Sequence, residues 1–200
     1  MQDYLFLIPA LLIAITFHEY AHARMAYAWG DPTAKNAGRL TLNPISHLDP
    51  LGALMILVVR FGWARPVPIN PANFRDQRQG LFWVSLAGPG MNLLIGLLAT
   101  ILLLNFQGLG PIYQTLMFNI ILINVFLAVF NMVPIPPLDG SKILVSILPK
   151  NYQRHYYAVE PYAPVLFIAL LLTGILPLFL RPIAFFIRDI FFFLASFLVF

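Results

Sequence analysis

The chain has no cysteine and few charged residues. The absence of cysteine excludes disulfide bonds and thiolate metal sites, so any bound metal would need histidine and carboxylate ligands. Only 10% of the 200 residues are charged, against about 25% in a soluble domain, whereas 60% are hydrophobic. The net charge of +4 is small and scattered, which argues against a nucleic-acid-binding protein. This composition predicts a chain that is embedded in a lipid bilayer.

Five apolar stretches have about the length that crosses a bilayer, for which about 20 residues suffice. They are Tyr4 to about Trp29, Leu81–Leu104, Ile112 to about Val133, Tyr162–Leu180 and Ile183–Phe200, the last two separated by Arg181 and Pro182. A further apolar run, Leu51–Val59, is too short to cross, which suggests a re-entrant piece. Six prolines between residues 30 and 80 favour turns and short extended segments there. We therefore expect an all-α membrane protein, a polytopic bundle of about five transmembrane helices with a re-entrant or extended region at residues 30–80.

Lysine and arginine are concentrated in two loops, at residues 30–80 and 139–161, whereas the connection at 105–111 has no charge. Cytoplasmic loops of membrane proteins carry an excess of these residues, so we expect both basic loops in the cytoplasm and the N-terminus outside. No internal repeat is present, and no polar stretch exceeds about 50 residues, near the lower limit for an independent domain. One membrane-embedded domain over residues 1–200 is the expected organisation.

The first apolar stretch contains the sequence Phe-His-Glu-Tyr-Ala-His at residues 17–22. His18 and His22 are four residues apart, so on a helix their imidazoles leave one face and can bind one metal ion. Glu19 is placed to take a proton from a water molecule activated by that metal. Three ionisable groups within five residues of an apolar helix are costly unless they face a cavity and bind a ligand. At 1.5 Å per residue, the pair lies roughly 20–27 Å along the helix from Tyr4, towards the cytoplasmic end.

A catalytic zinc ion needs three protein ligands and one open position, so the histidine pair requires a third partner. Asp139 follows three prolines that end the third predicted span, which places it at the same cytoplasmic depth as His18 and His22. The alternative for Asp139 is the N-cap of a following helix. Asn131, eight residues earlier, could donate a hydrogen bond to a developing oxyanion, or simply bond a neighbouring backbone group at the helix break.

These motifs resemble those of the site-2 protease family of intramembrane zinc metalloproteases, peptidase family M50. That family pairs His-Glu-x-x-His on one core helix with Asn-x-x-Pro and Leu-Asp-Gly elements on another, and residues 18–22 and 131–140 match them. The family's Gly-x-x-x-Asn element matches Gly88 to Asn92. The stretch from Asn43 to Gly52 is similar to compact bacterial members without a PDZ or CBS domain. The resemblance covers residues 16–146, and implies a catalytic core at about 4–148 followed by a terminal helix pair at about 162–200.

The resemblance implies that His18, His22 and Asp139 bind one Zn²⁺, that Glu19 is the general base, and that Asn131 orients water or stabilises the oxyanion. The implied substrates are transmembrane or membrane-adjacent proteins, cleaved near the cytoplasmic side of a bacterial inner membrane. Without an accessory domain, we expect either loose substrate selectivity or a membrane partner that delivers substrate or regulates cleavage. Gly88, Pro89 and Asn92 could help to bind an unwound substrate, but for Gly88, Gly90 and Asn92 we favour helix packing, because small residues let membrane helices approach each other closely.

Two further alternatives concern His47 and Asp49, and the function as a whole. His47 and Asp49 could approach the metal and regulate the site, but their spacing also fits a loop held by side-chain hydrogen bonds, which we favour. A catalytically silent membrane scaffold would have a broken motif, whereas every catalytic position here is filled. A metal transporter would show paired repeats and polar residues along several spans, which the sequence lacks.

Overall fold

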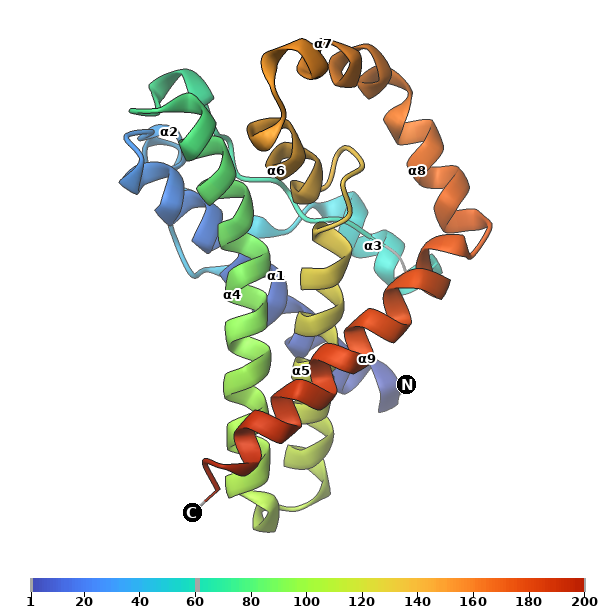
Figure 1. Ribbon diagram of the computed structural model, residues 1–200. Coiled ribbons are helices and arrows are strands. Elements are labelled where there is room, and N and C mark those ends of the chain that lie inside the picture. The colour runs from blue at the N-terminus through green and yellow to red at the C-terminus, as the bar shows by residue number, and fades with distance from the viewer. Residues whose placement is uncertain (1, 60–61, 200) are drawn as a thin grey trace.

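A computed structural model describes residues 2–59 and 62–199, so Phe200, the end of the last predicted span, lies outside the described residues. Three long helices form the centre of the molecule: α1 (Gln2–Ala28), α4 (Gln77–Asn105) and α5 (Pro111–Asn131) (Figure 1). Each of the three packs against the other two. All three are long and apolar enough to cross a membrane, which confirms the first three predicted spans.

Local sequence determines where α4 and α5 begin. Asp76 caps α4, because its carboxylate accepts a hydrogen bond from the Gln79 N–H at 2.8 Å. Gly110 precedes α5 with a φ of 90°, a conformation that glycine adopts without strain, and Pro111 occupies the first helical position. The connection between the two helices is short, with one 3-10 turn, η3 (Gln107–Leu109), so α4 and α5 run antiparallel side by side.

Residues 29–59 and 62–76 form short helices joined by turns, as the prolines predict: α2 (Thr33–Asn36), η1 (Pro44–His47), α3 (Pro50–Val59) and η2 (Pro71–Asn73). An isolated antiparallel bridge joins Leu48 to Ala64, and the Arg65 N–H donates to the His47 carbonyl at 2.9 Å. These two contacts join the chain segments that precede and follow α3. The re-entrant position predicted for residues 51–59 remains a prediction.

A buried aspartate holds this region to the end of α1. Asp31 is fully buried, and its carboxylate accepts hydrogen bonds from Thr33, from the Asn70 N–H at 2.7 Å and from the Asn73 side chain at 2.8 Å. A second contact is a hydrogen bond from the buried Arg39 guanidinium to the Arg65 carbonyl at 2.6 Å. The extended segment 64–70 therefore has a defined position beside α1.

The C-terminal third differs from the prediction. Its elements are α6 (Asp139–Ile147), α7 (Lys150–Val159), η4 (Glu160–Tyr162), α8 (Ala163–Leu172) and α9 (Ile175–Ser196). The predicted break at Arg181 and Pro182 is wrong, because Pro182 lies inside α9 and the chain breaks at Gly174, where φ is 72°. Glycine reaches this backbone conformation at no steric cost, which makes it the better site for a sharp bend.

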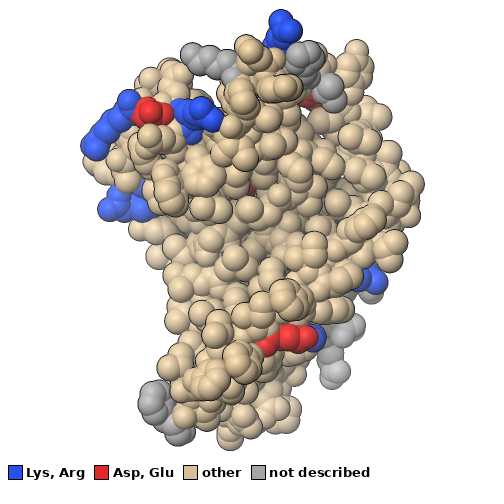
Figure 2. Space-filling model, viewed as in Figure 1, with Lys and Arg blue, Asp and Glu red and all other residues tan. Residues whose placement is uncertain are grey.

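The described helices do not confirm the predicted count of about five membrane-crossing helices. Among the described residues, three helices meet the length and composition of a span, or four if the pair 151–162 and 165–172, bent by 63°, counts as one. Helix α9 carries Arg181, Arg188 and Asp189 and is not among them. It crosses α4 and α5 obliquely and packs on both (Figure 1). In the same view, Lys and Arg side chains gather mainly at the upper end of the molecule, where α1 ends and α4 begins (Figure 2).

Candidate metal centre

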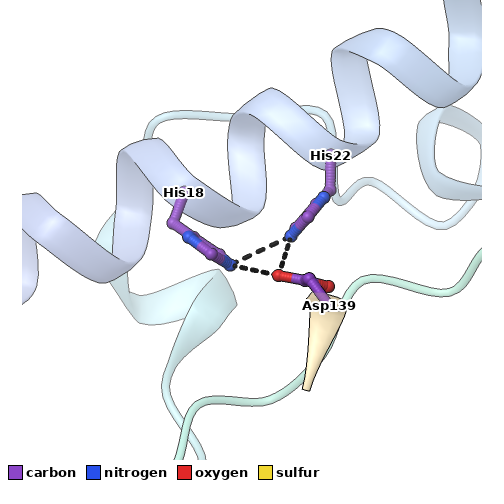
Figure 3. A group of neighbouring side chains, drawn as sticks. All are labelled: His18, His22 and Asp139. Atoms are coloured by element: carbon purple, nitrogen blue, oxygen red, sulfur yellow. Dashed lines mark hydrogen bonds and ion pairs between the residues drawn. The ribbon is translucent and has the colours of Figure 1, made fainter. Parts of the chain in front are cut away.

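Three buried side chains from distant parts of the sequence converge at the upper half of the bundle. The Nε2 atoms of His18 and His22 lie 2.9 Å apart, and Asp139 Oδ2 lies 3.2 Å from the first and 3.1 Å from the second. All three residues are buried. Figure 3 shows both imidazoles leaving one face of α1 towards the Asp139 carboxylate at the start of α6. Within the described ranges, these residues form the group that could hold a metal ion.

The turn between α5 and α6 brings Asp139 to this position. Gly140 permits the turn, because a Cβ atom there would collide with the backbone carbonyls of Met132 and Val133. The alternative function predicted for Asp139, a helix N-cap, is wrong. The N-cap of α6 is Leu138, and Asp139 is the first helical residue, with its carboxylate directed at the histidine pair.

The second nitrogen of each imidazole has an acceptor of its own. His18 Nδ1 lies 2.6 Å from Asn92 Oδ1, and His22 Nδ1 lies 2.7 Å from the Val84 carbonyl oxygen, both on α4. A carbonyl oxygen only accepts, so each Nδ1 carries the proton and each Nε2 presents a lone pair. Such partners orient metal-binding histidines and fix their tautomer. The sequence pattern identified Asn92, but it did not identify the Val84 carbonyl, which has no side-chain signal.

This donor set fits zinc. Two Nε2 lone pairs and a carboxylate within 3.2 Å of one another repel unless a proton or a metal ion lies between them, and three such groups make a ligand set for a metal ion. Tetrahedral ligands at about 2.1 Å from zinc would lie about 3.4 Å apart, close to the distances observed. Two histidines and one carboxylate leave a fourth position open, as catalytic zinc sites do. The site therefore accepts zinc with small side-chain movements.

Glu19 lies beside the cluster and is held by the backbone of the 64–70 segment. Its Oε2 atom accepts a hydrogen bond from the Val67 N–H at 2.9 Å. Val67 lies between Pro66 and Pro68, which have no N–H, so its N–H is the backbone donor of these three residues. The side chain of Glu19 is buried. Sequence reasoning identified Glu19, whereas the contact with residue 67 has no sequence signature.

A cavity of about 130 Å³ opens beside these groups. The histidine pair, Glu19 and Asp139 line it together with residues from four other parts of the chain, namely Pro66, Val67, Ile69, Val84, Ser85, Asn131, Pro137 and Lys142. Asn131 is half-buried, and its Nδ2 donates to the Leu127 carbonyl at 3.0 Å, the backbone bond that had been the alternative to a chemical role. Lys142 is half-exposed, with its Nζ atom 3.8 Å from Asp139 Oδ1.

The remaining predicted residues divide into those that touch the cluster and those that do not. Gly88 lies directly against both imidazoles, and Pro89 is fully buried within α4. His47 Nε2 donates to the Thr41 carbonyl at 2.8 Å, and Asp49 accepts from the Gly52 N–H at 2.8 Å at the start of α3. These bonds hold a loop, as we favoured, and neither residue lines the cavity.

Apolar helices surrounding a His–His–carboxylate cluster with an adjacent glutamate define a metalloprotease-type site in a helical membrane protein. Comparison with known proteins assigns the family. The profile of peptidase family M50 matches residues 109–173, a range that includes Asp139. "Putative zinc metalloprotease YwhC" of Bacillus subtilis strain 168 is 41% identical over 176 residues, which cover 84% of this chain and 80% of that protein.

Two more distant relatives carry similar names. "Putative zinc metalloprotease Rip2" of Mycobacterium tuberculosis strain H37Rv is 31% identical over 186 residues, 85% of this chain and 68% of its own length. "Putative zinc metalloprotease MJ0611" of Methanocaldococcus jannaschii is 34% identical over 133 residues, 64% of this chain and 63% of its own. No solved structure matches the chain at comparable significance. The chain belongs to peptidase family M50, the site-2 protease family of zinc metalloproteases.

Proposed function

We propose that the chain is an intramembrane zinc metalloendopeptidase in which His18, His22 and Asp139 hold one zinc ion. The observation that carries this proposal is the convergence of two Nε2 atoms and one carboxylate oxygen within 3.2 Å, in a buried cavity that also contains Glu19. The names of the Bacillus and Mycobacterium relatives support the same metal.

Zinc, when bound, would supply a Lewis acid that polarises the peptide carbonyl and lowers the pKa of water at the site. Glu19 accepts the proton of the attacking water and passes it to the amine nitrogen that leaves. The Val67 N–H holds one oxygen of this carboxylate in place, which orients the base before the substrate arrives. Asn131 uses one N–H on the Leu127 carbonyl, so the other N–H of its amide is the donor for the developing oxyanion.

The size of the cavity supports a locally extended substrate. A volume of about 130 Å³ accommodates a peptide bond with small side chains, but not an intact helix. A transmembrane substrate must therefore unwind near the cleaved bond, and its freed amides need partners in the membrane. The carbonyl groups of the extended segment 64–70, which lines the cavity, are suited to accept hydrogen bonds from it. The substrate would then reach the site from the lipid bilayer, delivered by a separate membrane partner.

The proposed orientation places the site near the cytoplasm of a bacterial cell, with the N-terminus outside. The distribution of Lys and Arg supports it, because the basic side chains gather mainly at the end of the molecule that carries the cavity (Figure 2). The same cavity is lined by residues from α1, α4, α5, α6 and the 64–70 segment, and α9 packs on α4 and α5, which together support one membrane domain over residues 1–200.

The test is zinc content, measured by mass spectrometry on detergent-purified protein, combined with cleavage in liposomes of a fluorogenic peptide that spans a transmembrane helix with a central helix-breaking residue. We expect one zinc per chain in the wild type, and loss of zinc in His22→Ala and in Asp139→Ala. Glu19→Gln should keep zinc and abolish cleavage, since its amide oxygen can still accept from Val67.

Glu160 provides the matched control for the glutamate. It is the other glutamate of the sequence, lies exposed in η4, and does not line the cavity. Glu160→Gln should cleave at the wild-type rate. A folded wild type that takes up no zinc, or an Asp139→Ala variant that retains it fully, would refute the proposed site. Cleavage by Glu19→Gln at the wild-type rate would refute the role of the base.

A further inference from the structure

A chain of buried amides connects the first histidine to α5. Asn92 on α4 faces His18 through its oxygen, and its nitrogen donates to the Ala14 carbonyl at 2.9 Å and to Asn124 Oδ1 at 2.8 Å. Asn124 on α5 donates in turn to the carbonyl of Ile120 at 2.9 Å. Both asparagines are fully buried. The network therefore joins α1, α4 and α5 in the apolar centre of the bundle.

The carbonyls at its ends fix the direction of every bond. A backbone carbonyl cannot donate, so the amide nitrogen of Asn124 must face Ile120 and its oxygen must face Asn92. Asn92 then donates both of its N–H groups, one to the Ala14 carbonyl and one to Asn124, so its oxygen is the atom that remains for His18. An imidazole facing an oxygen must carry its proton on Nδ1. The lone pair of His18 is thereby directed from Nε2 into the cluster.

We infer that Asn124 is a positioning residue of the metal site, which selects the metal-binding tautomer of His18 through Asn92. This inference rests on the proposed zinc site. Without Asn124, one N–H of Asn92 loses its acceptor in an apolar interior, where an unsatisfied donor is costly. The Ala14 carbonyl is then the acceptor that remains to oppose rotation of the Asn92 amide. A rotated amide would present an N–H to His18 Nδ1 and favour the tautomer with the proton on Nε2, which leaves no Nε2 lone pair for the metal. No motif of the sequence assigns this role to residue 124.

The experiment measures zinc affinity by chelator competition on the purified full chain. Asn124→Leu should weaken zinc binding about tenfold, the lower end of the range for residues that orient metal ligands. Asn119→Leu is the matched control, because Asn119 lies on the same helix, makes the same bond to the carbonyl four residues earlier, and is only half-buried. It should bind zinc as the wild type does. If Asn124→Leu unfolds, Asn124→Ala removes the same acceptor without bulk.

A double-mutant cycle separates positioning from packing. In an Asn92→Asp background the atom that faces His18 is an oxygen in either orientation of the side chain, so the orientation of residue 92 no longer decides the tautomer. Asn124→Leu should then change zinc affinity less than about twofold, whereas a packing role would lower it by the same factor in both backgrounds. Wild-type affinity in Asn124→Leu, or equal losses in both backgrounds, would overturn the inference while leaving the zinc site intact. A wild type without zinc would instead refute the proposed function.

Discussion

Gly88→Ala should destroy metal binding while leaving α4 helical. A Cβ atom at residue 88 would collide with His22 Nε2, and would lie 2.6 Å from His18 Cε1 and 2.7 Å from His18 Nε2. Ordinary van der Waals contact begins near 3.4 Å, so the His18 imidazole must move by about 0.7–0.8 Å and the His22 imidazole by more. Metal–ligand distances tolerate only about 0.2 Å. We therefore expect zinc affinity to fall about 100-fold or more, measured by chelator competition.

Gly90→Ala is the control, two residues further along the same helix. A Cβ atom there meets no atom within 4 Å, so zinc binding should be unchanged. Alanine favours a helix over glycine by about 1 kcal/mol, which for a chain of this length raises the unfolding temperature by about 2–4 °C. The two variants should thus differ in zinc content but not in helicity by circular dichroism. Full zinc occupancy in Gly88→Ala at wild-type affinity would refute the argument that the imidazoles need this space.

Three further predictions concern the region between α1 and α4. Burial raises the pKa of Asp31, but hydrogen bonds from Thr33 and Asn73 outweigh this effect and lower it below its ordinary value. The stability that Asp31 contributes is therefore present above about pH 4 and lost as the pH falls through its folded pKa. Asp31→Asn should lower the thermal unfolding midpoint at pH 7, and the midpoint of this variant should fall less between pH 7 and acidic pH than that of the wild type. Equal falls in the two proteins would contradict this prediction. Arg39→Met should release the 64–70 segment and speed its cleavage in limited proteolysis, whereas unchanged digestion would show that the guanidinium does not hold it. His47→Ala should cost about 1 kcal/mol of stability and leave zinc content unchanged, and loss of zinc would restore the regulatory reading of His47.

The sequence predicts the three central helices well because each is a long apolar run, and bilayer crossing depends on length and composition alone. It predicts the terminal pair poorly for a physical reason. Proline removes one N–H and is often read as a break, yet α9 continues through Pro182, as α1 does through Pro9 and α4 through Pro89. The bend falls instead at Gly174, whose conformational freedom carries no equally strong sequence signal.

In the candidate site, too, some features follow from the sequence and others do not. The spacing of His18 and His22 is a local property of one helix, so the sequence alone determines that both imidazoles share a face. The choice of Asp139 as their partner required a second argument from depth in the membrane, and the family resemblance supported it.

The sequence by itself therefore determined the class of protein, the helix that carries the histidine pair, and the chemical groups of the site. Only the tertiary structure decided how those groups are held. The acceptor of His22 lies 62 residues away, that of His18 lies 74 away, and the carboxylate lies 117 away. The Val67 N–H reaches Glu19 across 48 residues. A helical period fixes neighbours within four residues, whereas contacts at these separations depend on how three helices and an extended segment pack, and a backbone carbonyl or N–H leaves no mark in the sequence.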